Sequence, residues 1–179
     1  MTASDYTLFD TPIGECGIGW TGSRVVALQL PEVTAAATRE RLASLTKGGL
    51  DKEPPQFVQE VIAGIRRHLA GELDDLRWAP LDTTALPPFD RKVYTVTRAI
   101  DPGNTLTYGE VAELVDSRGA AQAVGQALGR NPIPILIPCH RVLAAGNRIG
   151  GFSAYGAVRT KRTLLTIEHA PGFDDPVLF

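Results

Sequence analysis

Cysteine and histidine are scarce in this sequence. Its 179 residues include two cysteines, Cys16 and Cys139, and three histidines. The spacings Cys-x-x-Cys and His-x-x-x-His are absent, so we expect no structural zinc site and no bound metal. A single disulfide is conceivable, but an intracellular chain of this size does not need one.

A long apolar run is also absent. No stretch approaches the ~20 apolar residues that span a bilayer, and the N-terminus, MTASDYTLFD, has neither the basic nor the apolar segment of a secretory signal. Hydrophobic residues make up 44% and charged residues 21% of the chain, as in soluble globular proteins. We therefore expect a cytoplasmic protein, nucleoid-associated if its source is bacterial, with one medium domain or two small ones.

The formal net charge is small, at −2, but it is unevenly distributed. Residues 1–84 carry 8 basic and 12 acidic side chains, a net charge of −4, whereas residues 85–170 carry 10 basic and 6 acidic ones, a net charge of +4. The total does not indicate nucleic-acid binding. Any polyanionic partner is expected to bind the second half.

The first half has the pattern of a small α/β unit. Short apolar or alternating runs separated by turn residues predict a strand meander over residues 1–30. Residues 33–45 predict a helix, and residues 56–70 predict a second, amphipathic helix. His68 falls on the polar side of that helix, where we expect a solvated histidine. Residues 77–82, RWAPLD, are a candidate for a last strand.

The second half has a helical pattern. Residues 83–88, TTALPP, predict a boundary because they combine turn chemistry with the change in sign of the charge, which gives domains at 1–84 and 85–179. The turn DSRG, with Ser117 as a candidate N-cap, joins two helices in a helix–turn–helix outline. The helices expected in this half are 89–100, 108–115, 120–128 and 158–169.

The helix at 120–128, AAQAVGQAL, has few large side chains. Small residues allow close packing of one helix on another, and they would equally allow close approach to a nucleic-acid groove. Both explanations stay open, and composition alone favours packing.

Cys139 follows a proline-rich apolar run in NPIPILIPCHRV, residues 131–142. A thiol attacks only as thiolate, and a free cysteine with a pKa of ~8.5 is mostly protonated at neutral pH. His140 is a candidate base, but neighbouring side chains on a strand point to opposite faces, so it needs a bend or a water to reach Cys139. Pro138 makes an irregular backbone plausible. An inert core cysteine remains an alternative.

Glu168 is a candidate for the third residue of a catalytic relay with Cys139 and His140. On the last expected helix it shares a face with Lys161, Leu164 and Leu165, at spacings of three, four and seven residues. That face is expected to point toward the core, and a buried carboxylate at a helix C-terminus needs a partner. A histidine such as His140 would supply one. A frayed, solvated helix end remains the alternative.

The run NPIPILIPCHRV, followed by AAGNRIGGFSAYG and TKRTLLTIE, resembles the methylated-DNA–protein-cysteine methyltransferases, also called O6-alkylguanine-DNA alkyltransferases. The match is good over residues 89–169, whereas the first 84 residues agree in layout alone. The resemblance implies an α/β plus mainly α fold, with a small N-terminal ribonuclease-H-like α/β domain followed by a winged-helix-like DNA-binding and alkyltransferase domain.

The resemblance also implies an activity, which is direct DNA repair. A cysteine of the protein takes the alkyl group from O6-alkylguanine, and from O4-alkylthymine, in double-stranded DNA, irreversibly and once per molecule. No cofactor, membrane or obligate protein partner is implied. The target base must leave the stack before its O6 carbon can be reached.

Carried over to this chain, the resemblance implies a role for each catalytic residue. Cys139 would be the nucleophile, His140 would deprotonate it through a water, and Glu168 would orient His140. Asn131 would hydrogen-bond within the active-site turn. Tyr108 would help to rotate the base out of the duplex and to protonate the leaving guanine.

Further residues would bind substrate and DNA. Main-chain groups of Cys139 and Val142, with Ser153, would read the flipped guanine, and Phe152 would form an aromatic wall. The helix with small side chains would enter the minor groove. The substrate- and DNA-binding residues implied are Gln122, Ala121, Gly125, Pro134, Arg130, Val142, Phe152 and Ser153.

Two glutamines depart from the family pattern. Gln122 stands where the groove-reading helix usually carries an arginine that fills the gap left by the flipped base, and Gln126 stands where a small residue is common. Gln122 can hydrogen-bond to the orphaned cytosine but brings no charge. The departures concern DNA binding and base flipping, and they leave the chemistry unchanged. Cys16, without companion ligands, is interpreted as structural.

Three competing functions are consistent with parts of the sequence. A non-catalytic damage sensor would not need Cys139. A cysteine hydrolase using Cys139, His140 and Glu168 would turn over many times and would lack the helix–turn–helix. A transcriptional regulator would need long polar side chains on the helix at 120–128 to read base edges in the major groove.

Overall fold

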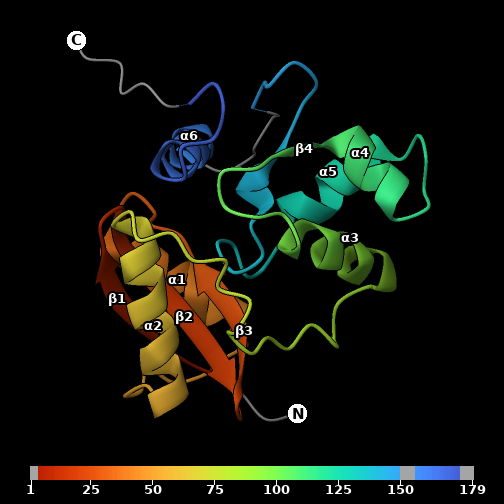
Figure 1. The fold of residues 1–179 in the computed structure, drawn as a ribbon. Coiled ribbons are helices and arrows are strands. Elements are labelled where there is room, and N and C mark those ends of the chain that lie inside the picture. The colour runs from red at the N-terminus through yellow and green to blue at the C-terminus, as the bar shows by residue number, and fades with distance from the viewer. Residues whose placement is uncertain (1–3, 150–155, 174–179) are drawn as a thin grey trace. The chain divides into compact units, whose positions relative to one another are not determined.

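The computed structural model describes residues 4–149 and 156–173. The chain forms two compact units, one of residues 1–83 with 132–136 and one of residues 84–131 with 137–179. The mixed α/β architecture expected from the sequence is observed (Figure 1).

The first unit is a three-stranded antiparallel sheet with two helices. Consecutive strands pair as neighbours, in the order β1-β2-β3. The elements are β1 (Asp5–Thr11), β2 (Gly14–Thr21), β3 (Arg24–Gln29), α1 (Ala35–Leu45) and α2 (Gln56–Leu69). The expected meander and both expected helices are therefore confirmed.

The two helices cover opposite faces of this sheet. A Cβ atom added to Gly17 in β2 would lie 2.4 Å from Leu42 in α1, so the glycine permits the close approach of that helix. The residue before it, Cys16, points to the other face and lies opposite Phe9 in the register. Arg66 of α2 lies over the Phe9 ring, 5.9 Å from its centroid. Figure 1 shows α2 in front of the sheet.

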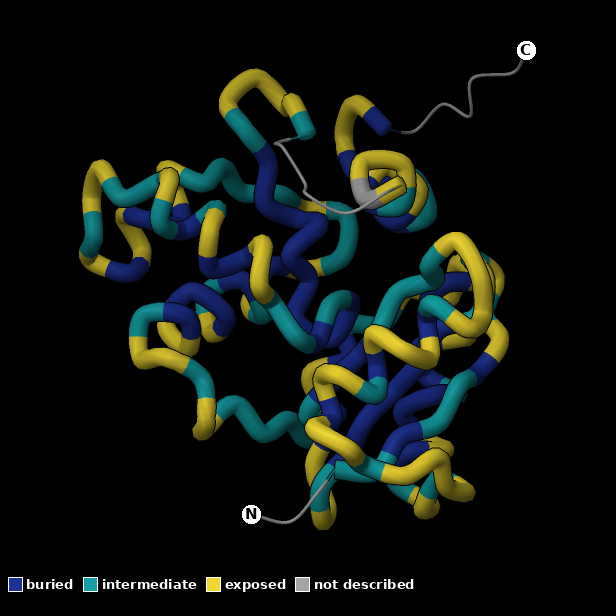
Figure 2. The backbone as a smooth tube through the Cα atoms, turned by 180° about the vertical axis from the view of Figure 1, so that it is seen from behind, coloured by how far each residue is buried: buried dark blue, intermediate teal, exposed yellow. Residues whose placement is uncertain are grey.

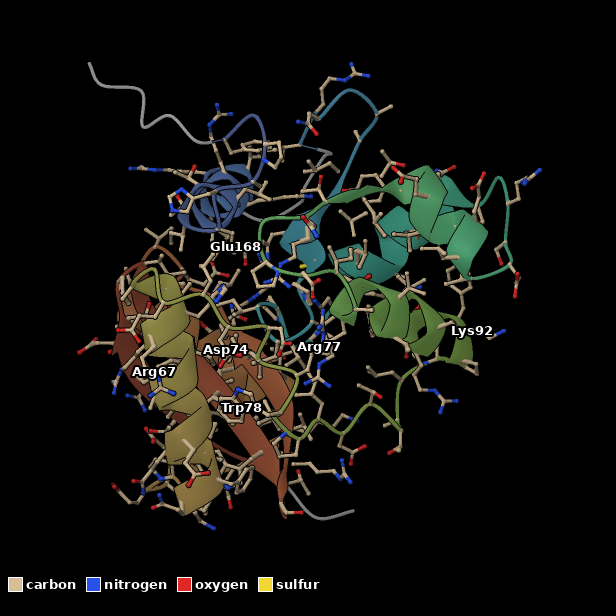
Figure 3. All side chains as sticks on the ribbon, in the orientation of Figure 1. Arg67, Asp74, Arg77, Trp78, Lys92 and Glu168 are labelled. Carbon is tan, nitrogen blue, oxygen red and sulfur yellow. The ribbon has the colours of Figure 1, made fainter. Side chains whose placement is uncertain are left out.

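Two expectations for the first unit are wrong. His68 is buried rather than solvated, because the loop after α2 folds over it and the amide of Asp74 donates to its Nδ1 at 3.1 Å. Figure 3 labels Asp74 and Trp78 in this loop. Residues 77–82 form one isolated bridge, Val25 to Leu81, instead of a strand. Pro80 accepts a bond there but has no N–H to extend a ladder.

Residues 132–136 group with the first unit, whereas the linear division into 1–84 and 85–179 placed them in the second. The amide of Leu28 in β3 donates to the carbonyl of Pro132 at 2.8 Å. Further along, the amide of Leu136 donates to Pro134 at 2.9 Å across Ile135, whose φ is 70°. This is a γ-turn with positive φ, a strained conformation for a β-branched residue.

The second unit is mainly helical. Two short strands pair in parallel, Leu106 opposite Val142. The elements are α3 (Pro88–Arg98), β4 (Leu106–Thr107), α4 (Tyr108–Leu114), α5 (Ala121–Gly129), the 3-10 turn η1 (Cys139–Arg141), β5 (Val142–Leu143) and α6 (Ala157–Ile167). All four helices expected here are confirmed, and residues 137–143 are buried (Figure 2).

Helix boundaries position the elements of this unit. Thr107 begins α4 with a capping box, in which its hydroxyl accepts from the Glu110 amide and Glu110 accepts from the Thr107 amide, both at 3.1 Å. Ser117 is not an N-cap, contrary to expectation. The N-cap of α5 is Ala120, three residues later, because the turn continues and the Ala120 amide donates to the Ser117 carbonyl.

Candidate active site

The backbone bends sharply at Cys139. Its amide donates to the carbonyl of Ile137 at 2.8 Å across Pro138, which has φ −79° and ψ 66°, the unstrained form of a γ-turn. The 3-10 turn follows directly, with the Arg141 amide bonded to Pro138 at 2.9 Å. The irregular backbone expected at Pro138 is confirmed. Cys139 and His140 therefore do not stand on an extended strand.

Cys139 lies in a closed environment, with 6% of its surface exposed. Burial raises the pKa of its thiol above the usual range, while a hydrogen bond with Asn131 and the positive charge of Lys161 act in the opposite direction. Asn131 also donates to the carbonyl of Ile137 at 2.9 Å, which ties the start of this loop to its end. The thiol thus needs a base or a cation to become a nucleophile.

His140 and Glu168 form a buried pair. His140 Nε2 lies 2.9 Å from Glu168 Oε1, and the side chains are 3% and 1% exposed. A carboxylate only accepts hydrogen bonds, so Nε2 carries the proton and Nδ1 is the nitrogen that can act as a base. Glu168 caps the C-terminus of α6 and points to the core, as expected from its face. Figure 3 labels it.

Arg141 binds the same carboxylate and shares its Oε1 with His140. Its Nε donates to Glu168 Oε2 at 3.0 Å and its Nη2 to Oε1 at 2.7 Å, while Nη1 donates to the carbonyl of Ile100 at 2.7 Å. The Arg141 side chain is 2% exposed. One buried carboxylate therefore joins η1 to α6, and the guanidinium extends the link to the end of α3.

Lys161 is a second buried cation. Its Nζ donates to the carbonyl of Val142 at 2.7 Å and to the hydroxyl of Tyr108 at 3.4 Å. Burial lowers the pKa of Lys161 to about 8, and the charge of Cys139 acts against this shift. Burial also raises the pKa of Tyr108, with a further contribution from Cys139. These two side chains and the thiol thus share one electrostatic environment.

Helix α5 presents both buried and exposed small residues. Ala127 is buried, and its carbonyl accepts from the Tyr94 hydroxyl at 2.6 Å, which packs α5 on α3. Ala121 and Gly125 are partly exposed, and a Cβ atom added to Gly125 would lie 3.8 Å from the Tyr108 ring. Gln122 is exposed. The packing explanation therefore accounts for Ala127, and the other small residues remain accessible.

Arg130 is held by an acid of the same unit. Its guanidinium makes two bonds of 2.8 Å to Asp90, which is 2% exposed, whereas the arginine side chain is 54% exposed. Arg130 directly precedes Asn131, so the pair anchors the start of the active-site loop to α3.

The remaining expected site residues are placed as follows. Val142 is buried, with its amide bonded to the Cys139 carbonyl and its own carbonyl bonded to Lys161. Pro134 lies in the segment that groups with the first unit. Phe152 and Ser153 lie outside the described residues.

Sequence reasoning missed Arg141 and Asp90 and did not assign Lys161 a role. The leucine-bearing face of α6 contained a signal for Lys161, because a lysine on a buried face needs a partner. Asp90 carried a weaker signal as the acidic residue in the first turn of α3. Nothing local marked Arg141, since both of its partners are distant in sequence.

The described ranges 4–149 and 156–173 contain no group of three or more His, Cys, Asp or Glu side chains that could hold a metal ion. Among the helices of these ranges, none is long and apolar enough to cross a membrane.

Comparison with known proteins gives consistent matches. The family model described as 6-O-methylguanine DNA methyltransferase, DNA binding domain, matches residues 88–170. The methylated-DNA–protein-cysteine methyltransferase of Haemophilus influenzae is 33% identical over 174 residues, which cover 97% of this chain and 91% of that protein.

Solved structures match over nearly the whole chain. Mycobacterium tuberculosis OGT in complex with DNA superposes with a TM-score of 0.73 at 31% identity, covering 94% of this chain and 96% of that one. The O6-methylguanine-DNA methyltransferase of Pyrococcus kodakaraensis KOD1 gives a TM-score of 0.71 at 28% identity, covering 91% and 98%.

Proposed function

Since this chain belongs to the family of methylated-DNA–protein-cysteine methyltransferases, we propose that it repairs DNA directly by moving the alkyl group of O6-alkylguanine onto Cys139. The observation that carries this assignment is that the buried Cys139 is followed directly by His140, whose Nε2 lies 2.9 Å from Oε1 of the buried Glu168. A base oriented by a carboxylate beside a thiol is the arrangement that generates a nucleophile.

The proposed reaction balances without a cofactor. His140 takes the thiol proton, through a water, and the thiolate attacks the alkyl carbon in line with the C–O bond. A new S–C bond forms as the bond to O6 breaks, and the electron pair stays on guanine. A proton from the Tyr108 hydroxyl neutralises the guanine, and loss of the proton held by His140 and reprotonation of Tyr108 through solvent complete the balance. The product is an S-alkylcysteine, so each protein molecule reacts once.

The loop geometry supports this role for Cys139. The turn at Pro138 and the 3-10 turn after it fix the backbone on both sides of the thiol. A fixed nucleophile needs little reorganisation when the substrate carbon is presented in line. Asn131, through its bonds with Ile137 and Cys139, keeps the loop closed.

DNA binding is proposed for the second unit, as a winged-helix-like domain in which α4 and α5 form the helix–turn–helix. The partly exposed Ala121 and Gly125 would allow α5 to approach the floor of the minor groove, with Gln122 reaching into the stack. The first unit is proposed to be ribonuclease-H-like. O4-alkylthymine is proposed as a second substrate of the same site.

Mass spectrometry tests the proposed function. The full chain is incubated with a duplex containing one O6-methylguanine, and intact and peptide masses are measured. We expect one added methyl group, on the peptide that contains Cys139, and no further addition with excess DNA.

Two cysteine variants make this test specific. Cys139→Ala should bind the duplex and gain no methyl group, whereas Cys16→Ala should react like the unmodified protein because Cys16 is buried in β2. Methyl transfer by Cys139→Ala would refute the assignment of the nucleophile. Binding without any transfer by the unmodified protein would favour a damage sensor.

A further inference from the structure

Arg141 makes more polar contacts with the catalytic carboxylate than His140 does. Its guanidinium occupies both oxygens of Glu168, and its remaining nitrogen bonds to the Ile100 carbonyl. Two bonds of 2.7 and 3.0 Å to its two oxygens hold the plane of the carboxylate, and the bond to Ile100 holds the guanidinium itself. The proton on His140 Nε2 therefore meets an acceptor that cannot rotate away.

The contact between Arg141 and Glu168 also influences the charge of His140. A buried carboxylate paired with a permanently charged guanidinium is neutral as a pair, so it has little tendency to draw a second positive charge onto the histidine. Without the guanidinium, the same buried carboxylate would be compensated best by an imidazolium, and His140 would hold its proton. A protonated His140 cannot accept the proton of Cys139.

We propose that Arg141 is a positioning residue, which keeps Glu168 ionised and oriented and thereby keeps His140 neutral and able to accept the thiol proton. The inference rests on the proposed function, because it concerns the base of that reaction. Arg141 itself contacts neither the thiol proton nor the alkyl group. Its effect on transfer passes entirely through Glu168 and His140.

Other titratable groups of the second unit also face this site. Cys139 and Arg141 lie on η1 with His140, and Lys161 and Glu168 come from α6. Tyr94 on α3 and Tyr108 on α4 approach from the helices, and both interact electrostatically with Cys139. A single substitution of Arg141 leaves these other groups in place, so the variant and the unmodified protein can be compared directly.

The test is the pH dependence of alkyl transfer from free O6-benzylguanine, a small substrate that needs no base flipping. Rates are measured between about pH 5 and 8, where histidine changes its charge. In Arg141→Met we expect the acid limb of the profile, where the rate falls as His140 is protonated, to shift to higher pH by about one unit or more. The loss of rate is then about tenfold or more at the acid end and shrinks toward pH 8.

Two further variants separate charge from folding. Arg141→Lys keeps the positive charge, so its acid limb should stay close to that of the unmodified protein even if its rate is lower throughout. Arg162→Met removes an exposed arginine of α6 that lies over Phe173, and it should leave the profile unchanged. A loss in Arg141→Met that is equal at every pH would mean a structural role and would overturn the proposal.

The imidazole signals of His140 in nuclear magnetic resonance give a second readout that does not depend on transfer. We expect His140 to titrate at a higher pH in Arg141→Met than in the unmodified protein. If Arg141→Met does not fold, Arg141→Gln, which is neutral but can still reach Ile100 and Glu168, replaces it. An unchanged titration overturns the proposal.

The measurements distinguish a failure of the proposed function from a failure of the proposed role of Arg141. If the unmodified protein transfers no alkyl group, the proposed function is wrong, and the His140 titration still decides whether Arg141 controls the charge of the histidine. If the unmodified protein reacts and neither the profile nor the titration moves in the variants, the role of Arg141 is wrong and the function stands.

Discussion

At the scale of single residues, the second unit buries two cations near one thiol. Arg141 is compensated by Glu168, whereas Lys161 donates to two neutral oxygens, the Val142 carbonyl and the Tyr108 hydroxyl. A buried ammonium beside neutral acceptors is costly unless a negative charge appears nearby. The Cys139 thiolate would supply that charge, so the cost of burying Lys161 is connected with the reactivity of the thiol.

This cost predicts a pH-dependent stability for Lys161→Met. The pKa of Lys161 is lowered from 10.5 to about 8 by burial, so between these values the unfolded chain binds a proton that the folded protein does not. The stability of the unmodified protein relative to Lys161→Met therefore rises with pH across this range. We predict that the difference in free energy of unfolding between the two proteins changes by about 2–3 kcal/mol from pH 7 to 10.5.

Denaturant titrations at several pH values measure this difference. Lys92→Met is the matched control, because Lys92 is exposed on α3 (Figure 3) and its removal should give a difference that is constant with pH. A constant difference for Lys161→Met as well would show that the folded protein keeps the ammonium at alkaline pH.

Individual residues differed in how far the sequence could place them. Glu168 was predictable because a helical face with two leucines has to be buried, and the carboxylate was carried with it. Arg141 was not, because its position between Glu168 and Ile100 depends on contacts 27 and 41 residues away. His68 was wrongly assigned to solvent because periodicity within α2 gave no information about the loop that covers it.

At the scale of elements, α4 matters because it begins at Tyr108. The capping box fixes that first turn through Thr107 and Glu110. Thr107→Ala removes an acceptor for an otherwise unpaired amide, and we predict a loss of about 1 kcal/mol in the free energy of unfolding. Transfer from duplex DNA should fall as well, because Tyr108 is less firmly held.

Thermal or denaturant unfolding checks this prediction against Thr163→Ala. Thr163 lies in α6, is exposed, and bonds to the carbonyl of Arg159 within its own helix. Its substitution should change stability by less than about 0.5 kcal/mol. Equal losses in the two variants would mean that the capping box does not stabilise α4.

Helix α5 gives a prediction about base flipping. Gln122 is exposed on the helix proposed to enter the minor groove, and it brings no charge to the duplex. Gln122→Arg should raise the rate of transfer from duplex DNA by about tenfold, as expected for one added charge-assisted contact of roughly 1.4 kcal/mol. The rate with free O6-benzylguanine should not change.

The matched control for this variant is Gln126→Arg. Gln126 is also exposed on α5, so it adds the same charge to the same helix one turn later. If both variants raise the rate on duplex DNA equally, the effect is general attraction of DNA and not insertion at the flipped base. Equal effects of Gln122→Arg on both substrates would exclude a role in flipping.

Element positions were largely predictable from periodicity, and turn chemistry was less so. Both helices of the first unit and all four of the second appear close to their expected ranges. Residues 77–82 were not a strand, because Pro80 has no N–H and the pairing with Val25 stays an isolated bridge. Ser117 had the right side chain for an N-cap, but the N-cap of α5 is Ala120, three residues later.

At the scale of the whole molecule, the chain crosses between its units more than once. Residues 132–136 group with the first unit although both flanking segments belong to the second. The bond between Leu28 and Pro132 that holds them joins residues more than 100 positions apart. Local patterns contain no information about such a pairing, which is why the sequence suggested one boundary near residue 84.

The charge asymmetry was visible in the sequence and has a consequence for DNA binding. The net charge is −4 over residues 1–84 and +4 over residues 85–170, so the phosphate contacts are expected to come from the second unit. DNA affinity falls with salt in proportion to the phosphates neutralised, with a slope of about 0.9 per contact. Arg118, in the turn between α4 and α5, has an 88% exposed side chain with its Nε 3.9 Å from Glu113, and we propose that it makes one such contact.

We predict that Arg118→Gln lowers the slope of log affinity against log salt concentration by about one. Arg41→Gln removes an arginine of the first unit whose side chain is 65% exposed, and it should leave the slope unchanged. Fluorescence anisotropy with an undamaged duplex over a series of salt concentrations measures both. A smaller slope for Arg41→Gln would show that the acidic half also contacts phosphates, and the assignment of DNA binding to the second unit alone would be wrong.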